Sequence, residues 1–220
     1  MIAATQSLYN QNCLGVVLTG GLSSRMGSDK ALLNRYTKNS TQESMLSFST
    51  QQLKTVGVDH VVVSGKKHGL ADHFENLGPM GGIYTVIKEY YPRALLILPV
   101  DLPLIDSESL NQLKRVGELS QKACFYHNNY LPLYLPITAF VAQFLEKAFV
   151  PFKQAMPSTK SSSPVSIKGP SIKALLAQTP HKCLTPASTQ MLFNANTPEQ
   201  WQQAKQKLQH QILHNRKNHV

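Results

Sequence analysis

Short, continuous apolar runs in the first half of the chain constrain its fold more than any other feature. They cover residues 14–18 (LGVVL), 60–64 (HVVVS) and 94–98 (ALLIL), and none of them alternates with polar side chains. Such runs are typical of strands in a parallel sheet that is covered on both faces. Helical patterns at residues 43–57 and 81–91 separate them. The alternation predicts an α/β fold with a three-layer, doubly wound, mostly parallel sheet.

The second half of the chain mixes strand and helix patterns and has no internal repeat. We expect helices at 106–116, 137–149 and 171–178, and strands at 122–126, 130–135 and 188–194. Pro132 predicts an edge position for its strand, because proline cannot donate a hydrogen bond to a ladder. Thr197, Pro198 and Gln200 form a capping box that begins a last helix. The predicted buried stripe of that helix is Trp201, Ala204, Leu208 and Ile212.

Length and composition bound the class of protein. With 220 residues, 42% of them hydrophobic, the chain can bury one sizeable core, so we expect a single domain over 1–220. Within it we expect a flexible segment at 1–12 and a mobile loop rich in Pro, Ser and Lys at 151–170. No run approaches the roughly 20 apolar residues that span a bilayer, and the start lacks the pattern of a secretory signal. Three widely spaced cysteines without a CxxC pair are typical of reduced thiols in a cytoplasmic protein.

The net charge of +10 favours anionic partners. The lysines are scattered, however, and no block interleaves them with aromatic residues as nucleic-acid-binding proteins do. We therefore expect a pocket for phosphorylated ligands rather than a nucleic-acid or membrane surface.

The first candidate site follows the first predicted strand, in the stretch LTGGLSSRMGSDKALL (18–33). In a doubly wound sheet the loop after this strand lies at the edge where ligands bind. Gly20 and Gly21 let backbone amides approach a ligand closely, and Arg25 and Lys30 supply cations for phosphate oxygens. The pattern is neither the Walker loop nor GxGxxG. The alternative is a glycine turn before a charged surface helix.

A second candidate is Asp101, which ends the apolar strand of LILPVDLP between Pro99 and Pro103. A carboxylate in this place suits a hard cation such as Mg²⁺, and the alternative is an aspartate that caps a turn. Asn196, in NANTP near the C-terminus, can add an uncharged metal ligand, or it can belong to the cap of the last helix.

A third candidate is the turn LGPMGGI, which leads into a helix. Its glycines permit close approach of a ligand to a helix N-terminus, and the alternative is a tight turn with helix packing through Gly82. The histidines show no metal-ligand spacing, and we interpret them as surface or half-buried rings.

The order of these blocks resembles the nucleotidyltransferases of the molybdenum cofactor, and most closely the molybdenum cofactor guanylyltransferases. The likeness rests on LTGGLSSRMGSDKALL, GPMGGI, LPVDLP and NANTPEQW, and it spans residues 14–202. Gly20-Gly21, Asp29-Lys30 and Asn194 to Pro198 match the guanylyl branch rather than the cytidylyl one. The family usually carries an asparagine where this chain has Ser64-Gly65, and an aspartate before Gly78 that is missing here.

The resemblance implies a Rossmann-like nucleotide-diphospho-sugar transferase fold and a set of site residues. The implied catalytic residues are Arg25, Lys30 and Asp101, and the implied Mg²⁺ ligands are Asp101 and Asn196. The implied nucleotide-binding residues are Leu18, Thr19, Gly20, Gly21, Ser23, Arg25, Lys30, Ser64, Asn76, Gly78, Pro79, Gly82 and Asp101. The basic stretch from Lys153 to Lys173 is the candidate for the pterin.

The resemblance also implies a reaction in which GTP and molybdopterin form a guanine dinucleotide and pyrophosphate. The pterin phosphate would attack the α-phosphorus in line, with Arg25 and Lys30 neutralising the β- and γ-phosphates and Mg²⁺ on Asp101 bridging phosphate oxygens. Other proteins of molybdenum cofactor synthesis are the expected partners. Two alternatives remain open: a related cytidylyl or sugar-phosphate nucleotidyltransferase, and a nucleotide-binding homologue without turnover.

Overall fold

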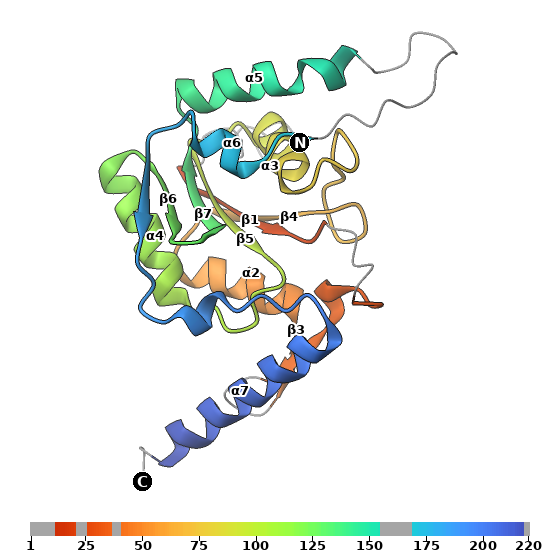
Figure 1. The fold of residues 1–220 in the computed structure, drawn as a ribbon, viewed down its shortest axis with the longest axis vertical. Helices are drawn as coiled ribbons and strands as arrows, with labels where there is room; N and C mark the ends of the chain where they lie inside the picture. The colour runs from red at the N-terminus through yellow and green to blue at the C-terminus, as the bar shows by residue number, and fades with distance from the viewer. Residues whose placement is uncertain (1–11, 21–25, 37–40, 155–168, 218–220) are drawn as a thin grey trace, which may run out of the picture.

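A six-stranded sheet crosses the molecule in the computed structural model (Figure 1), which describes residues 12–20, 26–36, 41–154 and 169–217. Side chains of the last helix are described as far as His210. From one edge to the other, the strands are β4 (His60–Ser64), β1 (Leu14–Leu18), β5 (Ala94–Pro99), β7 (Asn129–Pro136), β6 (Ala123–Tyr126) and β8 (His181–Leu184).

The sheet is mostly parallel. β1 pairs in parallel with both β4 and β5, and β6 pairs in parallel with β8. Only β7 among these six strands is antiparallel to its neighbours, β5 and β6. The predicted doubly wound, mostly parallel α/β sheet is therefore confirmed.

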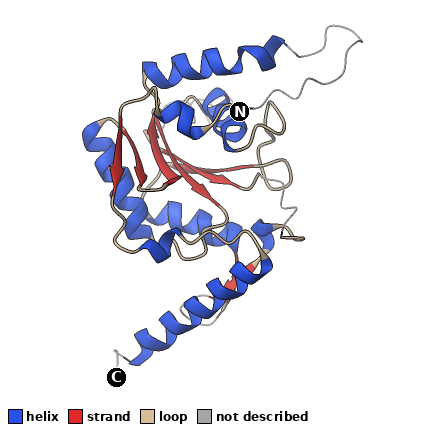
Figure 2. Cartoon of the chain, viewed as in Figure 1, coloured by secondary structure: helices blue, strands red, loops and turns tan. Residues whose placement is uncertain are grey.

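Helices cover both faces of this sheet and complete three layers (Figure 2). α2 (Met45–Thr55) and α4 (Ser107–Ser120) lie on one face, and α3 (Pro79–Tyr90), α5 (Ala139–Gln154) and α6 (Ile172–Leu176) lie on the other. Side chains of β5 alternate between the two cores: Leu96 and Leu98 pack with α2 and α4, and Leu95 and Ile97 pack with α3 and α5. Burial on both faces explains why the strand is continuously apolar.

The remaining elements lie at the margin of the sheet. A hairpin of β2 (Asn34–Tyr36) and β3 (Gln42–Ser44) follows the short 3-10 helix η3 (Lys30–Leu32), and a second 3-10 helix is η4 (Thr189–Leu192). The longest helix, α7 (Pro198–Lys217), extends away from the three layers toward the C-terminus (Figure 1). It is anchored by the buried side chains of Trp201, Ala204 and Leu208, as predicted, while the side chain of Ile212 lies outside the described residues. No described helix combines the length and the apolar character needed to cross a membrane.

The predicted strand at 188–194 is wrong. Met191 and Leu192 are consecutive and both buried, which suits the 3-10 turn η4 and not the alternating faces of a strand. The last strand is β8 instead, whose side chains are almost all exposed, so its apolar pattern is too weak to indicate a strand.

The predicted edge position of Pro132 is also wrong, because β7 lies between β5 and β6. The pairing of β7 with β6 shifts register next to Pro132: Leu133 opposes Phe125, and the following pair is Asn129 with Tyr126. Proline is tolerated at such a bulge because no ladder bond needs its missing N–H.

The helix α5 continues through Pro151 to Gln154, so the first four residues of the loop expected at 151–170 are helical. Phe149 and Phe152 pack in one aromatic cluster with Phe74, and this contact stabilises the last turn. Residues 155–168 and 1–11 lie outside the described residues.

Candidate active site

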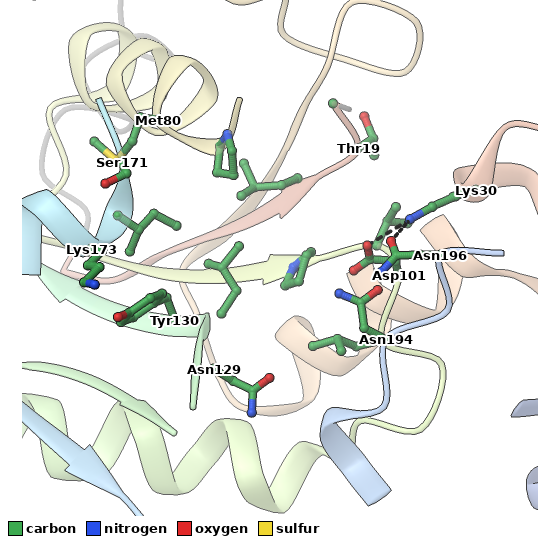
Figure 3. Close-up of a pocket in the computed structure, with 18 of the residues that line it drawn as sticks. Thr19, Lys30, Met80, Asp101, Asn129, Tyr130, Ser171, Lys173, Asn194 and Asn196 are labelled. Carbon is green, nitrogen blue, oxygen red and sulfur yellow. Dashed lines mark hydrogen bonds and ion pairs between the residues drawn. The ribbon is translucent and has the colours of Figure 1, made fainter. Parts of the chain in front are cut away.

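The candidate active site is a cavity of about 760 Å³ at the edge of the sheet where β1 and β5 end (Figure 3). Because the two strands are parallel, the residues that follow them meet here: the amide N of Val100 donates to the carbonyl O of Leu18 at 3.1 Å. The lining comprises Leu18, Thr19, Gly20, Lys30, Pro79, Met80, Pro99, Val100, Asp101, Leu102, Asn128, Asn129, Tyr130, Leu131, Pro170, Ser171, Ile172, Lys173, Asn194 and Asn196.

Three segments that are far apart in the sequence converge at one end of this cavity. The ammonium Nζ of Lys30 donates to Asp101 Oδ2 at 3.0 Å and to Asn196 Oδ1 at 2.5 Å (Figure 3). The amide N of Ala195 donates to the carbonyl O of Asp101 at 3.0 Å, which holds the segment of Asn196 against the end of β5. The structure thus brings together three side chains that the sequence singled out.

The oxygen atoms of this cluster fit a hard divalent cation. Asp101 Oδ1 is buried and has no hydrogen-bond partner among the described residues. Carboxylate and amide oxygens are the ligands that Mg²⁺ takes from proteins, usually together with substrate phosphates and water. Within the described part of the chain, no group of three or more His, Cys, Asp or Glu side chains could hold a metal. A cation at Asp101 and Asn196 would therefore complete its coordination with water or with oxygens from a bound substrate.

Thr19 and Gly20 follow β1 and line the cavity. Thr19 is anchored by its amide N and its Oγ1, which both donate to the carbonyl O of Ser64, at 2.9 and 2.8 Å. A Cβ on Gly20 would meet no atom of the described residues within 4 Å, so these residues leave its backbone accessible from the cavity. Gly21, Ser23 and Arg25 lie outside the described residues.

The Gly-Pro turn brings the N-terminus of α3 to the cavity. Gly78 caps this helix at φ +61°, a conformation that favours glycine, and Pro79 and Met80 line the cavity. Gly82 is buried one turn further along, where a Cβ would lie 2.2 Å from Ser64 Oγ, so its small size lets α3 pack against β4.

Not every predicted nucleotide-binding residue lines the cavity. Ser64 is 2% exposed, and its Oγ donates to Asp72 Oδ1 at 3.3 Å. Burial raises the pKa of Asp72, and the hydrogen bond from Ser64 opposes this effect. Asn76 is exposed in a left-handed turn at φ +63°. Four of the predicted residues therefore do not line the cavity: Ser64, Asn76, Gly78 and Gly82. The other described candidates belong to the lining.

The opposite end of the cavity carries polar residues that sequence reasoning did not single out. Asn129 and Tyr130 begin β7, and Ser171 and Lys173 begin α6 (Figure 3). Because β7 is antiparallel, its first residues lie at the same sheet edge as the last residues of β5. Lys173 belongs to the basic stretch predicted for the pterin, and it is the second cation of the lining after Lys30.

The turn that bears Lys30 is held by a histidine that sequence reasoning also missed. His68 Nε2 lies 2.8 Å from Asp29 Oδ2, and Asp29 Oδ1 accepts from the amide N of Ala31 at 3.1 Å. Burial tends to raise the pKa of Asp29, but the hydrogen bonds from His68 and Ala31 and the charges of His68 and Lys67 together lower it below its ordinary value. No spacing in the sequence connects His68 to Asp29, because the contact depends on how the loop after β4 folds.

This fold, with a cavity at the carboxyl ends of β1 and β5, is the Rossmann-like fold of nucleotidyltransferases, and the chain is a nucleotidyltransferase. Its residues 15–148 match the MobA-like NTP transferase domain, and the chain belongs to that family.

Individual relatives agree with this assignment. The molybdenum cofactor guanylyltransferase of Xanthomonas euvesicatoria pv. vesicatoria (strain 85-10) is 34% identical over 192 residues, which are 85% of this chain and 91% of that protein. Molybdopterin-guanine dinucleotide biosynthesis protein A from Archaeoglobus fulgidus shares the fold with a TM-score of 0.63 at 16% identity, over 88% of this chain and 97% of that one. Rv0371C from Mycobacterium tuberculosis H37Rv, in complex with manganese, shares the fold with a TM-score of 0.52 at 12% identity, over 90% and 99% of the two chains.

Proposed function

We propose that this nucleotidyltransferase transfers the GMP moiety of GTP to molybdopterin and releases pyrophosphate. The observation that carries the proposal is the cluster of Lys30, Asp101 and Asn196 at the carboxyl ends of β1 and β5. The name of the 34% identical relative supports the choice of molybdenum cofactor and guanine. The cytoplasmic location expected from three widely spaced cysteines without a CxxC pair belongs to the same proposal.

The chemistry asks for positioning and charge neutralisation. The phosphate of molybdopterin is already ionised, so its attack on the α-phosphorus of GTP needs no side-chain base. This agrees with a lining that holds no His, Cys or Glu among the described residues. Lys30 and Arg25 would neutralise charge on the β- and γ-phosphates, and the accessible backbone of Gly20 would let the triphosphate approach the loop after β1.

Asp101 and Asn196 are the residues that would hold a divalent cation, which we propose to be Mg²⁺. When bound, such a cation supplies further neutralisation of phosphate charge. The manganese complex of the Mycobacterium tuberculosis protein is in keeping with a divalent cation in this fold. Asp101 also has a second task, because its Oδ2 directs the ammonium of Lys30 toward the cavity.

The two ends of the cavity suit two ligands. The end with Lys30 and Asp101 would take the nucleotide phosphates, and the end with Tyr130 and Lys173 would take the pterin, whose flat ring system suits the side of an aromatic residue. Tyr130 is 41% exposed, and Lys173 is exposed as well, so both are available to a ligand.

Thermal stabilisation by nucleotides tests the proposal. We expect GTP with Mg²⁺ to raise the melting temperature more than CTP, ATP or UTP, because a ligand that binds only the folded state stabilises it. Adding molybdopterin to GTP and Mg²⁺ should then release pyrophosphate. A preference for CTP would favour a cytidylyl transferase, and a shift with GTP but no pyrophosphate would favour a homologue that binds nucleotide without turnover.

A further inference from the structure

The loop between β4 and α3 is joined to the turn that carries Lys30 by the hydrogen bond between His68 and Asp29. Asp29 is the N-cap of η3, and Lys30 is the first residue of η3. The side chain of His68 is only 15% exposed and that of Asp29 25% exposed, so the pair is largely shielded from water. The carboxylate of Asp29 thus accepts one hydrogen bond from each segment, from His68 and from the amide N of Ala31.

The segment that presents His68 is a closed turn. The amide N atoms of Gly65 and Leu70 donate to the carbonyl O atoms of Leu70 and Val63, both at 2.8 Å. Inside the turn, the amide N of His68 donates to the carbonyl O of Gly65 at 3.0 Å. A turn with this many internal bonds holds its side chains in place, so His68 is a fixed anchor for Asp29.

Gly65 allows this turn to sit close to the loop after β1. It adopts φ +141°, and a Cβ there would lie 2.1 Å from Thr19 Oγ1 and 3.3 Å from the amide N of Gly20. Any side chain at residue 65 would therefore force the turn and the loop apart.

We propose that His68 is a positioning residue for Lys30: by holding Asp29, it fixes the start of η3 and with it the direction in which the Lys30 ammonium enters the cavity. This inference rests on the proposed function, which gives Lys30 its role in neutralising the phosphates of the nucleotide. The low pKa of Asp29 is consistent with it, because the carboxylate that accepts both bonds is the ionised form.

The consequence for the reaction is quantitative. Misplacing a charged group by about 1 Å can cost on the order of 100-fold in rate. Without His68, η3 keeps the hydrogen bond between Asp29 and Ala31 but loses its hydrogen bond to the loop after β4. We expect kcat for nucleotidyl transfer to fall about 10- to 100-fold, with KM for the nucleotide changed less than about threefold, because the backbone of Gly20 would remain accessible to the phosphates.

The test compares His68→Ala, His68→Gln, Asp29→Asn and the double variant His68→Ala/Asp29→Asn by pyrophosphate release. His68→Gln retains an N–H donor and should recover most of kcat. The double variant should be no worse than either single one, because the two residues act through one bond. His73→Ala is the matched control: His73 Nε2 lies 2.6 Å from Glu89 Oε1 of α3 in an equivalent but more exposed pair, and its loss should leave kcat unchanged.

An NMR titration of the Asp29 carboxyl group separates this inference from the proposed function. His68→Ala should raise the pKa of Asp29, whether or not the protein forms the guanine dinucleotide. If wild-type protein releases no pyrophosphate from any nucleotide, the proposed function fails, while the titration still shows whether His68 is hydrogen-bonded to Asp29. An active wild type with unchanged kcat in His68→Ala, or additive losses in the double variant, would overturn the positioning role.

Discussion

Replacing Lys30 by methionine tests the central cluster of the site directly, because methionine keeps most of the length of the side chain and removes its charge. Lys30 Nζ lies 3.0 Å from Asp101 Oδ2, and the two side chains are only 16% and 18% exposed. At an effective dielectric constant of about 20, two unit charges at this distance attract each other by roughly 5 kcal/mol. Desolvation and residual exposure cancel more than half of this, so we expect a loss of about 2 kcal/mol of unfolding free energy.

This loss should be visible as a change in melting temperature. For a chain of this size, about 1 kcal/mol corresponds to roughly 2 to 4 °C, so Lys30→Met should melt about 4 to 8 °C below wild type in EDTA. Lys114→Met is a matched control, because Lys114 pairs with Glu118 at 3.2 Å within α4 and neither residue lines the cavity. An i, i+4 pair of this kind contributes about 0.3 to 0.5 kcal/mol, so the control should melt within about 2 °C of wild type.

A divalent cation should reverse the loss in the variant. At 100 times its dissociation constant, a ligand stabilises the folded state by about 2.7 kcal/mol. In Lys30→Met the oxygens of Asp101 and Asn196 are no longer used by the ammonium, so Mn²⁺ or Mg²⁺ should restore most of the melting temperature. In wild type the cation must first displace Lys30, and without nucleotide the gain should stay under about 1 kcal/mol.

Two results would refute this reasoning. Equal melting temperatures of Lys30→Met and wild type in EDTA would mean that the pair contributes no stability. Equal stabilisation of both proteins by Mn²⁺ would mean that the cation and the ammonium do not compete for the same oxygens.

Four further predictions concern Asp101, Gly82 and the cysteines. Asp101→Ala should abolish nucleotidyl transfer and leave the far-ultraviolet circular dichroism spectrum unchanged. Full turnover in this variant would contradict the assignment of Asp101 as a metal ligand. Gly82→Ala should lower the free energy of unfolding by about 1 to 3 kcal/mol in urea titrations, because its Cβ would lie 2.2 Å from Ser64 Oγ. Burial raises the pKa of Cys13 from 9.0 to about 12, so stability present below pH 9 should decline as the pH rises toward 12, and Cys13→Ala should weaken this decline. Of the three cysteines, only the exposed Cys183 should react rapidly with a thiol reagent at pH 8, and a second fast thiol would contradict the burial of Cys13.

The sequence predicts the layers of the fold well because burial on both faces leaves a continuous apolar signature. β1 and β5 carry it because they are buried on both faces, whereas the edge strand β4 is apolar but only partly buried. The apolar pattern fails where strand pairing decides the structure. Pro132 predicts an edge strand, yet a register shift between β6 and β7 accommodates it inside the sheet. Residues 188–194 look like a strand, although the packing of Met191 and Leu192 imposes a 3-10 turn.

The same contrast holds for the site. Lys30, Asp101 and Asn196 could be singled out because each follows a strand or precedes a helix in a motif of recognisable chemistry. Tyr130 could not, because its place in the cavity depends on the antiparallel direction of β7. His68 could not either, since its contact with Asp29 joins residues 39 positions apart through a loop with no distinguishing pattern.

The polar character of β8 has a consequence for solubility. An edge strand offers free backbone groups to any other strand, and proteins protect such edges with charged and polar side chains, lysine above all. His181, Lys182 and Cys183 are all exposed on β8, at the end of the six-stranded sheet. β8 has few apolar residues, so the sequence pattern does not indicate a strand there. The same polar character discourages two molecules from joining their sheets edge to edge.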